Sequence, residues 1–341
     1  MILLYIAIVL LSVIGIGWRR EQDSAQCLSK QQCNAIKGIS ILLVFVSHAN
    51  QYVNGQGYGY SILGDQLFLA INGSIGQLCV VMFLFYSGYG TELSILNKGE
   101  TYAQRIPKRR CLTTLLNFDV AVVVFLVVSL LLGKTVTLSK FCLSLTGWES
   151  IGNSNWYIFD IILCYFISFL ATRITTEPSK RFLTVLALTV MLIGLLYTFK
   201  QSWWYDTLLA YPAGALVAWR KDWFFKLARK HYWVVLATAL LSFVLLINFG
   251  LAHVLTYNLA SVLFAILVVT ITMRVRVENR VLVWLGANLF PIYIYQRVPM
   301  MVMDHWCPSL VVSCPLGFCI VSLAITIMIA LAYRYVKISI D

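Results

Sequence analysis

The histidine at position 48 lies in an apolar stretch that begins near a lysine. In CNAIKGISILLVFVSHANQYV, residues 33–53, ten residues that are almost all uncharged separate Lys37 from His48. Eleven steps of about 100° return the two side chains to one helix face. A rise of about 1.5 Å per residue places them roughly 16 Å apart, about half a hydrocarbon core. The spacing therefore predicts a lysine at a membrane surface and a histidine deep inside the membrane.

Two further ionisable residues are expected at a similar depth. Asp160 in NSNWYIFDIILCY and Arg297 in FPIYIYQRVPMMV each lie about five or six residues from the outer end of an apolar run. Ionisable groups inside a membrane are costly and usually face an aqueous cavity or one another. An imidazole can accept a proton from a reacting hydroxyl, a carboxylate can orient that imidazole, and an arginine can stabilise an oxyanion. We therefore interpret His48, Asp160 and Arg297 as candidate catalytic residues. A purely structural histidine and a simple Asp160–Arg297 ion pair are the alternatives.

Membrane-spanning helices must position these residues. The chain has 341 residues, of which 60% are hydrophobic and 12% charged, and its mean hydropathy is +0.82. Soluble domains are about a quarter charged. Most apolar runs are about 16–22 residues long, which suits helices and exceeds the length of outer-membrane strands. We predict an all-α polytopic membrane protein with about eleven spans, at 2–18, 36–53, 76–96, 113–133, 155–172, 182–199, 203–219, 232–250, 254–273, 282–303 and 310–335.

The distribution of basic residues predicts the orientation. With the N-terminus outside, 22 of the 26 basic residues fall in cytoplasmic loops, while Lys134, Lys140 and Lys200 fall in outer loops. Such a bias marks the cytoplasmic side of a membrane protein. It predicts a cytoplasmic C-terminus and a multi-pass protein of the cell membrane. Basic residues kept on one side of the membrane, beside its lipids, also explain the net charge of +12, so no nucleic-acid partner is needed to account for it.

Two segments, one beside the predicted spans and one within a span, leave alternatives open. QRIPKRRCL, which contains residues 105–110, is dense in cations and could contact anionic lipids or bind a phosphorylated cytosolic ligand. Glu92 and Asp119 are interpreted as acidic partners of this basic segment. FLFYSGYGTEL places Ser87, Gly88 and Gly90 at mid-membrane, where small residues permit close approach of a helix or a ligand.

The cysteines do not indicate a metal site. The chain has nine, with no CxxC motif and no His/Cys cluster at metal-ligand spacing, so no metal is expected. Several lie in apolar runs, where thiols behave as small hydrophobic groups. Cys307 and Cys314 share a loop and are the one pair considered for a disulfide.

Five segments in a fixed order resemble the membrane acyltransferase-3 family, whose members transfer acyl groups to hydroxyls of glycans. The segments are Lys37 to His48, FLFYSGYG at 83–90, the basic segment at 105–110, NWYIFDIILCY at 155–165 and LGANLFPIYIY at 285–295. The resemblance runs from about residue 33 to 335. It implies an acyltransferase domain at 33–341 with a ten-helix core, preceded at 1–32 by an extra transmembrane helix and a cytoplasmic loop.

The resemblance also implies a chemistry and its residues. The donor would be cytosolic acyl-CoA, usually acetyl-CoA, and the acceptor a hydroxyl of a cell-surface or lipid-linked glycan. His48 matches the catalytic histidine, and Lys37 the basic residue that opens its motif. The segment linked to the CoA phosphates contains Arg105, Lys108 and Arg109, and the small-aromatic signature contains Ser87 and Tyr89.

The sequence departs from the family pattern at three points. Lys37 stands where arginine is commoner, which keeps the charge and loses bidentate geometry. Gln296 and Arg297 follow the tyrosine of the last motif, where a histidine is often found. The chain stops at 341 with no appended soluble domain, so acyl transfer is expected to finish in the membrane part.

Two other functional classes remain alternatives to an enzyme. A transporter would also carry ionisable groups at mid-depth, although no pair of related halves is evident. A non-catalytic membrane subunit with a degenerate site is the other, since the family pattern is changed at Lys37 and Gln296. Within the enzyme interpretation, O-acetylation of a sugar is favoured over an amine acceptor.

Overall fold

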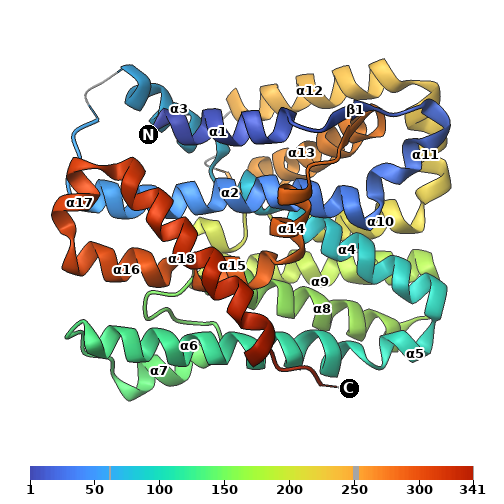
Figure 1. The fold of residues 1–341 in the computed structure, drawn as a ribbon. Helices are drawn as coiled ribbons and strands as arrows, with labels where there is room; N and C mark the ends of the chain where they lie inside the picture. The colour runs from blue at the N-terminus through green and yellow to red at the C-terminus, as the bar shows by residue number, and fades with distance from the viewer. Residues whose placement is uncertain (61–62, 249–252, 341) are drawn as a thin grey trace.

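The computed structural model describes residues 1–60, 63–248 and 253–340, and nearly all of its regular structure is helical (Figure 1). Within these ranges, seven helical stretches are long and apolar enough to cross a membrane. They contain α2 (Lys30–Gly55), α3 (Leu63–Ile75) with α4 (Leu78–Lys98), α5 (Glu100–Ala103) with α6 (Thr113–Leu131), α8 (Trp156–Ile174), α9 (Pro178–Phe199), α13 (Val254–Arg274) and α18 (Pro315–Val336). The expected all-α multi-pass membrane protein is thus confirmed, while the number of eleven spans and the orientation stay predictions.

Four predicted spans are not single helices in the structure, and one of them, at 310–335, is divided at Cys314 between α17 (Pro308–Ser313) and α18. The prediction at 2–18 corresponds to α1 (Ile2–Val13) and then strand β1 (Ile16–Trp18), which pairs antiparallel with β2 (Val275–Val277). The prediction at 203–219 corresponds to the 3₁₀ turn η3 (Ser202–Trp204) and then α10 (Ala210–Trp219). The predicted span at 282–303 is divided among three short helices.

Helices α14 (Arg280–Ala287), α15 (Leu289–Tyr295) and α16 (Arg297–Trp306) follow one another with breaks at Asn288 and Gln296. Pro291 and Pro299 lack a backbone N–H and crowd the preceding turn, so a continuous helix is disfavoured here. Irregular backbone at membrane depth is tolerated where it is buried in protein or lines a cavity. The breaks are therefore expected to be buried in protein or to line a cavity.

The other elements connect these helices. A bend of 99° joins α11 (Lys221–Lys230) to α12 (Tyr232–Asn248), and the two together could form one further span. Short helices complete the described chain: η1 (Glu21–Leu28), the π-helix η2 (Pro107–Leu112), α7 (Leu138–Leu145) and α17 (Pro308–Ser313).

Glycines allow two pairs of helices to touch through their backbones. A Cβ added to Gly88 on α4 would strike the carbonyl oxygen of Tyr211 on α10, and one added to Gly214 would strike that of Phe85. Gly38 and Gly286 meet in the same reciprocal way between α2 and α14. The second contact fixes the helix of His48 against the broken helix α14–α16. Gly88 is thus a packing residue, which settles one of the alternatives left open by the sequence.

A buried ion pair joins α4 to α9. Nη2 of Arg181 lies 2.5 Å from Oε1 of Glu92, both side chains are buried, and the Arg181 Nη1 donates to the carbonyl of Thr176 at 3.1 Å. The expected pairing of Glu92 with the basic segment 105–110 is therefore wrong, because Arg181 occupies this carboxylate. Oδ1 of Asp119 is buried and has no hydrogen-bond partner among the described residues.

The cysteines are all free thiols, including Cys307 and Cys314, so the disulfide considered from the sequence is not formed. Both are exposed and flank the two ends of the short helix α17.

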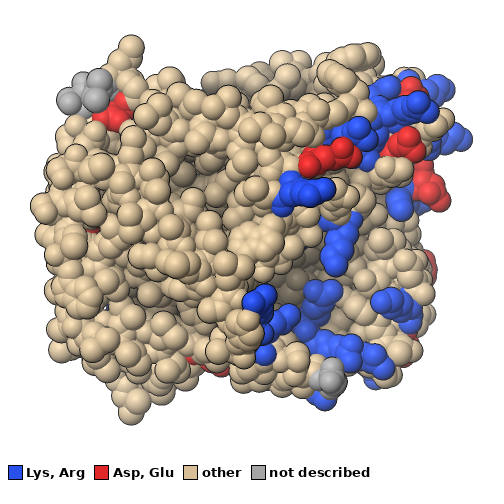
Figure 2. All heavy atoms as spheres, in the orientation of Figure 1, with Lys and Arg blue, Asp and Glu red and all other residues tan. Residues whose placement is uncertain are grey.

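The surface is apolar along the helices and charged at one end. Large hydrophobic side chains are exposed on α9 and α12, for example Met191 and Trp233, as expected of a surface that faces lipid. Figure 2 shows Lys and Arg gathered toward one end of the molecule, at the right of this view. We call it the basic end; Figure 1 places α5 and α11 there.

Candidate functional site

Two cavities enter the helical bundle. The first, of about 600 Å³, is lined by basic side chains from several elements, and we call it the basic cavity; its cations are Lys37, Arg110, Arg334 and Lys337. The second, of about 930 Å³, is lined by many rings, and we call it the aromatic cavity; its rings are Trp148, Trp156, Phe199, Trp203, Trp204, Tyr257 and Tyr293. His48 and Arg297 line the aromatic cavity.

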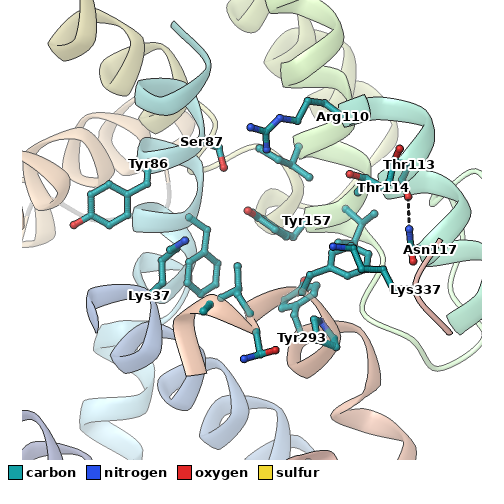
Figure 3. A pocket seen from close by; sticks show the side chains of 18 of the residues that line it. Lys37, Tyr86, Ser87, Arg110, Thr113, Thr114, Asn117, Tyr157, Tyr293 and Lys337 are labelled. Carbon is teal, nitrogen blue, oxygen red and sulfur yellow. Dashed lines mark hydrogen bonds between the residues drawn. The ribbon is translucent and has the colours of Figure 1, made fainter. Parts of the chain in front are cut away.

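The basic cavity gathers polar groups from several helices around its cations (Figure 3). Ser87 comes from α4, while Thr113, Thr114 and Asn117 come from α6. The guanidinium carbon of Arg110 lies 5.7 Å from the centre of the Tyr165 ring, a cation–π contact that holds the arginine at the wall. In Figure 3 the Arg110 and Lys37 side chains approach from opposite walls. Cations and hydroxyls in one concave space can bind a phosphorylated ligand.

Not all of the cations predicted for this role line the cavity. Lys37 does so, as does the predicted polar residue Ser87, whereas Arg105, Lys108 and Arg109 do not line the cavity and are exposed. The π-helix η2 (Pro107–Leu112) contains Lys108, Arg109 and Arg110, and its wider turn changes the direction of side chains from that of an α-helix. Arg110 is therefore the member of the segment that reaches the cavity. Tyr89 is buried on α4 and does not line this cavity.

A clamp holds the C-terminal segment against the mouth of the basic cavity. Nδ2 of Asn117 donates to the carbonyl of Ile338 at 2.8 Å, and the Ile338 N–H donates to Oδ1 of Asn117 at 3.0 Å. The Tyr333 hydroxyl donates to the same oxygen at 2.7 Å. One buried amide thus fixes the stretch that carries Arg334 and Lys337.

The aromatic cavity is built largely from two loops, with residues 148–156 on one side and 199–206 on the other. Lys200 joins them: its Nζ donates to the Trp148 carbonyl at 2.7 Å and lies 4.0 Å and 4.5 Å from the ring centres of Trp148 and Trp204. Asn155 holds the first loop by donating to the Gly147 carbonyl at 2.7 Å. The result is a rigid cavity that offers ring faces and backbone polar groups to a ligand.

His48 and Arg297, which lie far apart in the sequence, share the wall of this cavity. His48 is 9% exposed, and its Nδ1 has no hydrogen-bond partner among the described residues. Arg297 donates through Nη2 to Oε1 of Gln51, one turn along α2 from His48. The Nε of Arg297 is buried without a partner in the described chain. Unsatisfied polar groups at a cavity wall are available to a ligand.

Asp160 does not join them. It is buried on α8, lines neither cavity, and neither of its carboxylate oxygens has a hydrogen-bond partner among the described residues. The carboxylate–imidazole pair hypothesised from the sequence is therefore not formed in this structure, and nor is an Asp160–Arg297 ion pair.

The two cavities approach each other at Tyr293. Of the described residues, Tyr293 alone lines both of them. Its ring centre is 6.3 Å from that of His48 and 5.3 Å from that of Tyr157, in an edge-to-face contact. Tyr157 makes a similar contact with Phe83 at 5.8 Å. A thin layer of rings therefore separates the basic cavity from the histidine.

Several of these residues were not identified from the sequence. Tyr293 lies within LGANLFPIYIY, and Trp148 and Trp204 lie in loops rich in tryptophan. The tryptophans of these loops were a sequence signal for a site lined by aromatic rings. Arg110 was included in the basic segment but not chosen. Arg334, Lys337 and Asn117 gave no local signal, because their roles depend on contacts between α6 and the end of α18.

Comparison with known proteins identifies the family. A family model described as "Acyltransferase domain", of the acyltransferase-3 type, matches residues 31–334. No curated protein and no solved structure gave a significant match. The match covers most of the chain and includes the walls of both cavities up to Arg334. With its long apolar helices, this chain therefore belongs to the acyltransferase-3 family of membrane acyltransferases.

Proposed function

We propose that this protein transfers an acetyl group from cytosolic acetyl-CoA to a hydroxyl of a glycan at the outer surface of the cell membrane. The observation that carries the proposal is the pair of cavities that meet at Tyr293, with cations in one and His48 in the other. A donor and an acceptor could then approach from opposite ends and meet at the imidazole.

The basic cavity is the proposed donor site. The phosphates of CoA carry several negative charges, and Arg110, Arg334, Lys37 and Lys337 offer fixed positive charge to them. The deeper wall is apolar and aromatic, with Phe83, Tyr157 and Tyr293, and suits the slender pantetheine arm and its thioester. The cationic mouth would hold the nucleotide while the thioester points toward the ring layer.

The aromatic cavity is the proposed acceptor site. Sugar rings have apolar C–H faces that pack well on aromatic rings, while their hydroxyls need polar partners. Both are present in this cavity, in Trp203 and Trp204 and in the side chains of Gln51 and Asn153. Its volume of about 930 Å³ is large enough for more than one sugar unit.

In the proposed reaction, the acceptor hydroxyl oxygen attacks the thioester carbonyl carbon. His48 takes the hydroxyl proton as the C–O bond forms, and the C–S bond breaks when the tetrahedral intermediate collapses. The proton then passes from His48 to the CoA thiolate, which leaves as the thiol. Arg297 would stabilise the oxyanion from the same wall. A short-lived acyl-histidine is the alternative route to the same products.

A sidedness experiment tests the proposal. The purified protein is reconstituted into sealed vesicles and given labelled acetyl-CoA on one side and candidate polysaccharide or lipid-linked saccharides on the other. We expect label in the glycan only when acetyl-CoA is supplied at the basic end. Turnover with acetyl-CoA at the opposite end, or absence of transfer to every hydroxyl acceptor, would overturn it.

The Asn117 clamp yields a prediction about donor binding. Asn117→Ala removes three hydrogen bonds to the segment that carries Arg334 and Lys337, each worth about 1 kcal/mol. We expect the KM for acetyl-CoA to rise roughly five- to tenfold with a small change in kcat, because the cations lose their fixed position. Steady-state kinetics would measure both. Lys337→Ala should raise KM in the same direction, and an unchanged KM in both variants would contradict the proposed role of this mouth.

A further inference from the structure

The layer of rings between the two cavities is thin. On α4, Val80 lines the aromatic cavity and Phe83 the basic cavity. Three residues correspond to about 4.5 Å along a helix axis. On α8, the adjacent residues Trp156 and Tyr157 line the aromatic and the basic cavity respectively. The separation between the cavities is therefore about one aromatic ring deep.

Tyr293 is the part of this layer with a cavity on both sides. Its side chain is 1% exposed, and its hydroxyl makes no well-formed hydrogen bond among the described residues. The neighbouring Gln296 is fully buried, and its Nε2 donates to the Tyr293 carbonyl at 3.2 Å. A side-chain hydrogen bond from Gln296 therefore reaches the backbone that carries the ring.

Tyr293 lies on a short helix that is broken on both sides. The ring is carried by the seven-residue helix α15, with a break on each side at Asn288 and Gln296. Pro291 and Pro299 lie in the first turns of α15 and α16, where the missing N–H prevents hydrogen bonds that would continue the preceding helix across each break. Short helices bounded by such breaks can absorb changes in backbone angle without unfolding the rest.

We propose that Tyr293 is a gate between the donor and acceptor cavities: its ring excludes water from the thioester at rest and turns aside when the acyl group passes to His48. The direction of acyl passage rests on the proposed function, but the separation of the cavities by the ring does not. An open connection would let water reach the donor. Water would then attack the thioester carbon, the C–S bond would break, and acetic acid and the CoA thiol would be released without an acceptor.

Removal of the ring should therefore uncouple the enzyme. In Tyr293→Ala we expect acceptor-independent hydrolysis of acetyl-CoA to rise about tenfold, because an opened site admits water to a reactive group. Transfer to the acceptor should fall relative to hydrolysis. Tyr293→Phe keeps the ring and should keep the low hydrolysis of the wild type. Release of the CoA thiol, measured with and without acceptor, gives both rates.

A native thiol reports the opening independently of catalysis. Cys79 lines the aromatic cavity, on the far side of Tyr293 from the cations. In sealed vesicles that expose the basic end, a small, anionic, membrane-impermeant thiosulfonate is added outside, and modification of Cys79 is measured by peptide mass spectrometry. We expect Cys79 to stay unmodified in the wild type and in Tyr293→Phe, and to react in Tyr293→Ala.

Tyr295→Ala is the matched control. Tyr295 lies on the same short helix and is equally buried, but it lines neither cavity and packs against Tyr333. This variant should increase neither hydrolysis nor Cys79 labelling. If Tyr293→Ala is folded and shows no increase in either, or if Tyr295→Ala increases both to the same degree, the gate is overturned. If the wild type consumes no acetyl-CoA, the proposed function fails, and the labelling of Cys79 still decides whether Tyr293 separates the cavities.

Discussion

Replacement of His48 by alanine should lower acetyl transfer by at least about 100-fold, because general-base assistance by a positioned histidine contributes roughly 10²–10⁴ to a rate. The side chain lines the acceptor side of the ring layer, and no other histidine lines either cavity within the described residues. Without it, the attacking hydroxyl loses the imidazole that would accept its proton.

The loss should be confined to chemistry. Lys37, Arg110, Arg334 and Lys337 line the other cavity, so binding of acetyl-CoA to His48→Ala, measured by calorimetry, should stay within about twofold of the wild type. The matched control is His305→Ala, since His305 is exposed at the end of α16 and outside both cavities; its transfer rate should be unchanged. Full activity in His48→Ala would remove the proposed mechanism. Loss of donor binding together with activity would instead indicate a structural role.

The spacing of Lys37 and His48 was informative because both lie on one continuous helix. Helix geometry fixes the distance between residues of the same element, so about 16 Å along α2 could be inferred without a structure. The structure places the two residues on the walls of different cavities, on either side of Tyr293. The apolar runs likewise predicted the long helices, because the length needed to cross a membrane is set by the bilayer.

Relations between different helices could not be predicted in the same way. The sequence predicts similar membrane depths for His48, Asp160 and Arg297, yet only His48 and Arg297 share a cavity. Depth along a helix says nothing about which face of it meets a neighbour. The choice of Arg181 as partner of Glu92 depends in the same way on the packing of α4 against α9.

Local irregularities account for the other differences. The π-helical turn of η2 brings Arg110 to the basic cavity and leaves Lys108 and Arg109 outside it. The breaks around α15 place Tyr293 between the cavities. Periodicity assumes a regular helix, so it fails where proline or a wide turn changes the direction of side chains.

Replacement of Gly88 by alanine should lower the stability of the protein, because two helix backbones touch at this residue. In Gly88→Ala the new methyl group would strike the carbonyl oxygen of Tyr211. A backbone carbonyl cannot turn away as a flexible side chain can, so α4 and α10 must separate. Their other reciprocal contact, at Gly214, would be lost as well. We expect the free energy of unfolding to fall by at least roughly 1–3 kcal/mol, the usual cost of overpacking.

Gly90 provides the matched control, two residues along the same helix. A Cβ added there meets no atom within 4 Å. Alanine also favours a helix over glycine by up to about 1 kcal/mol, so Gly90→Ala should be neutral or slightly stabilising. The midpoint temperature of thermal unfolding, measured on the purified variants in detergent, should therefore fall for Gly88→Ala and stay the same or rise for Gly90→Ala. Equal stability of the two variants would mean that α4 and α10 do not meet at Gly88. In that case α4, which carries Ser87 and Phe83, would not be held in the position from which the wall of the basic cavity is built.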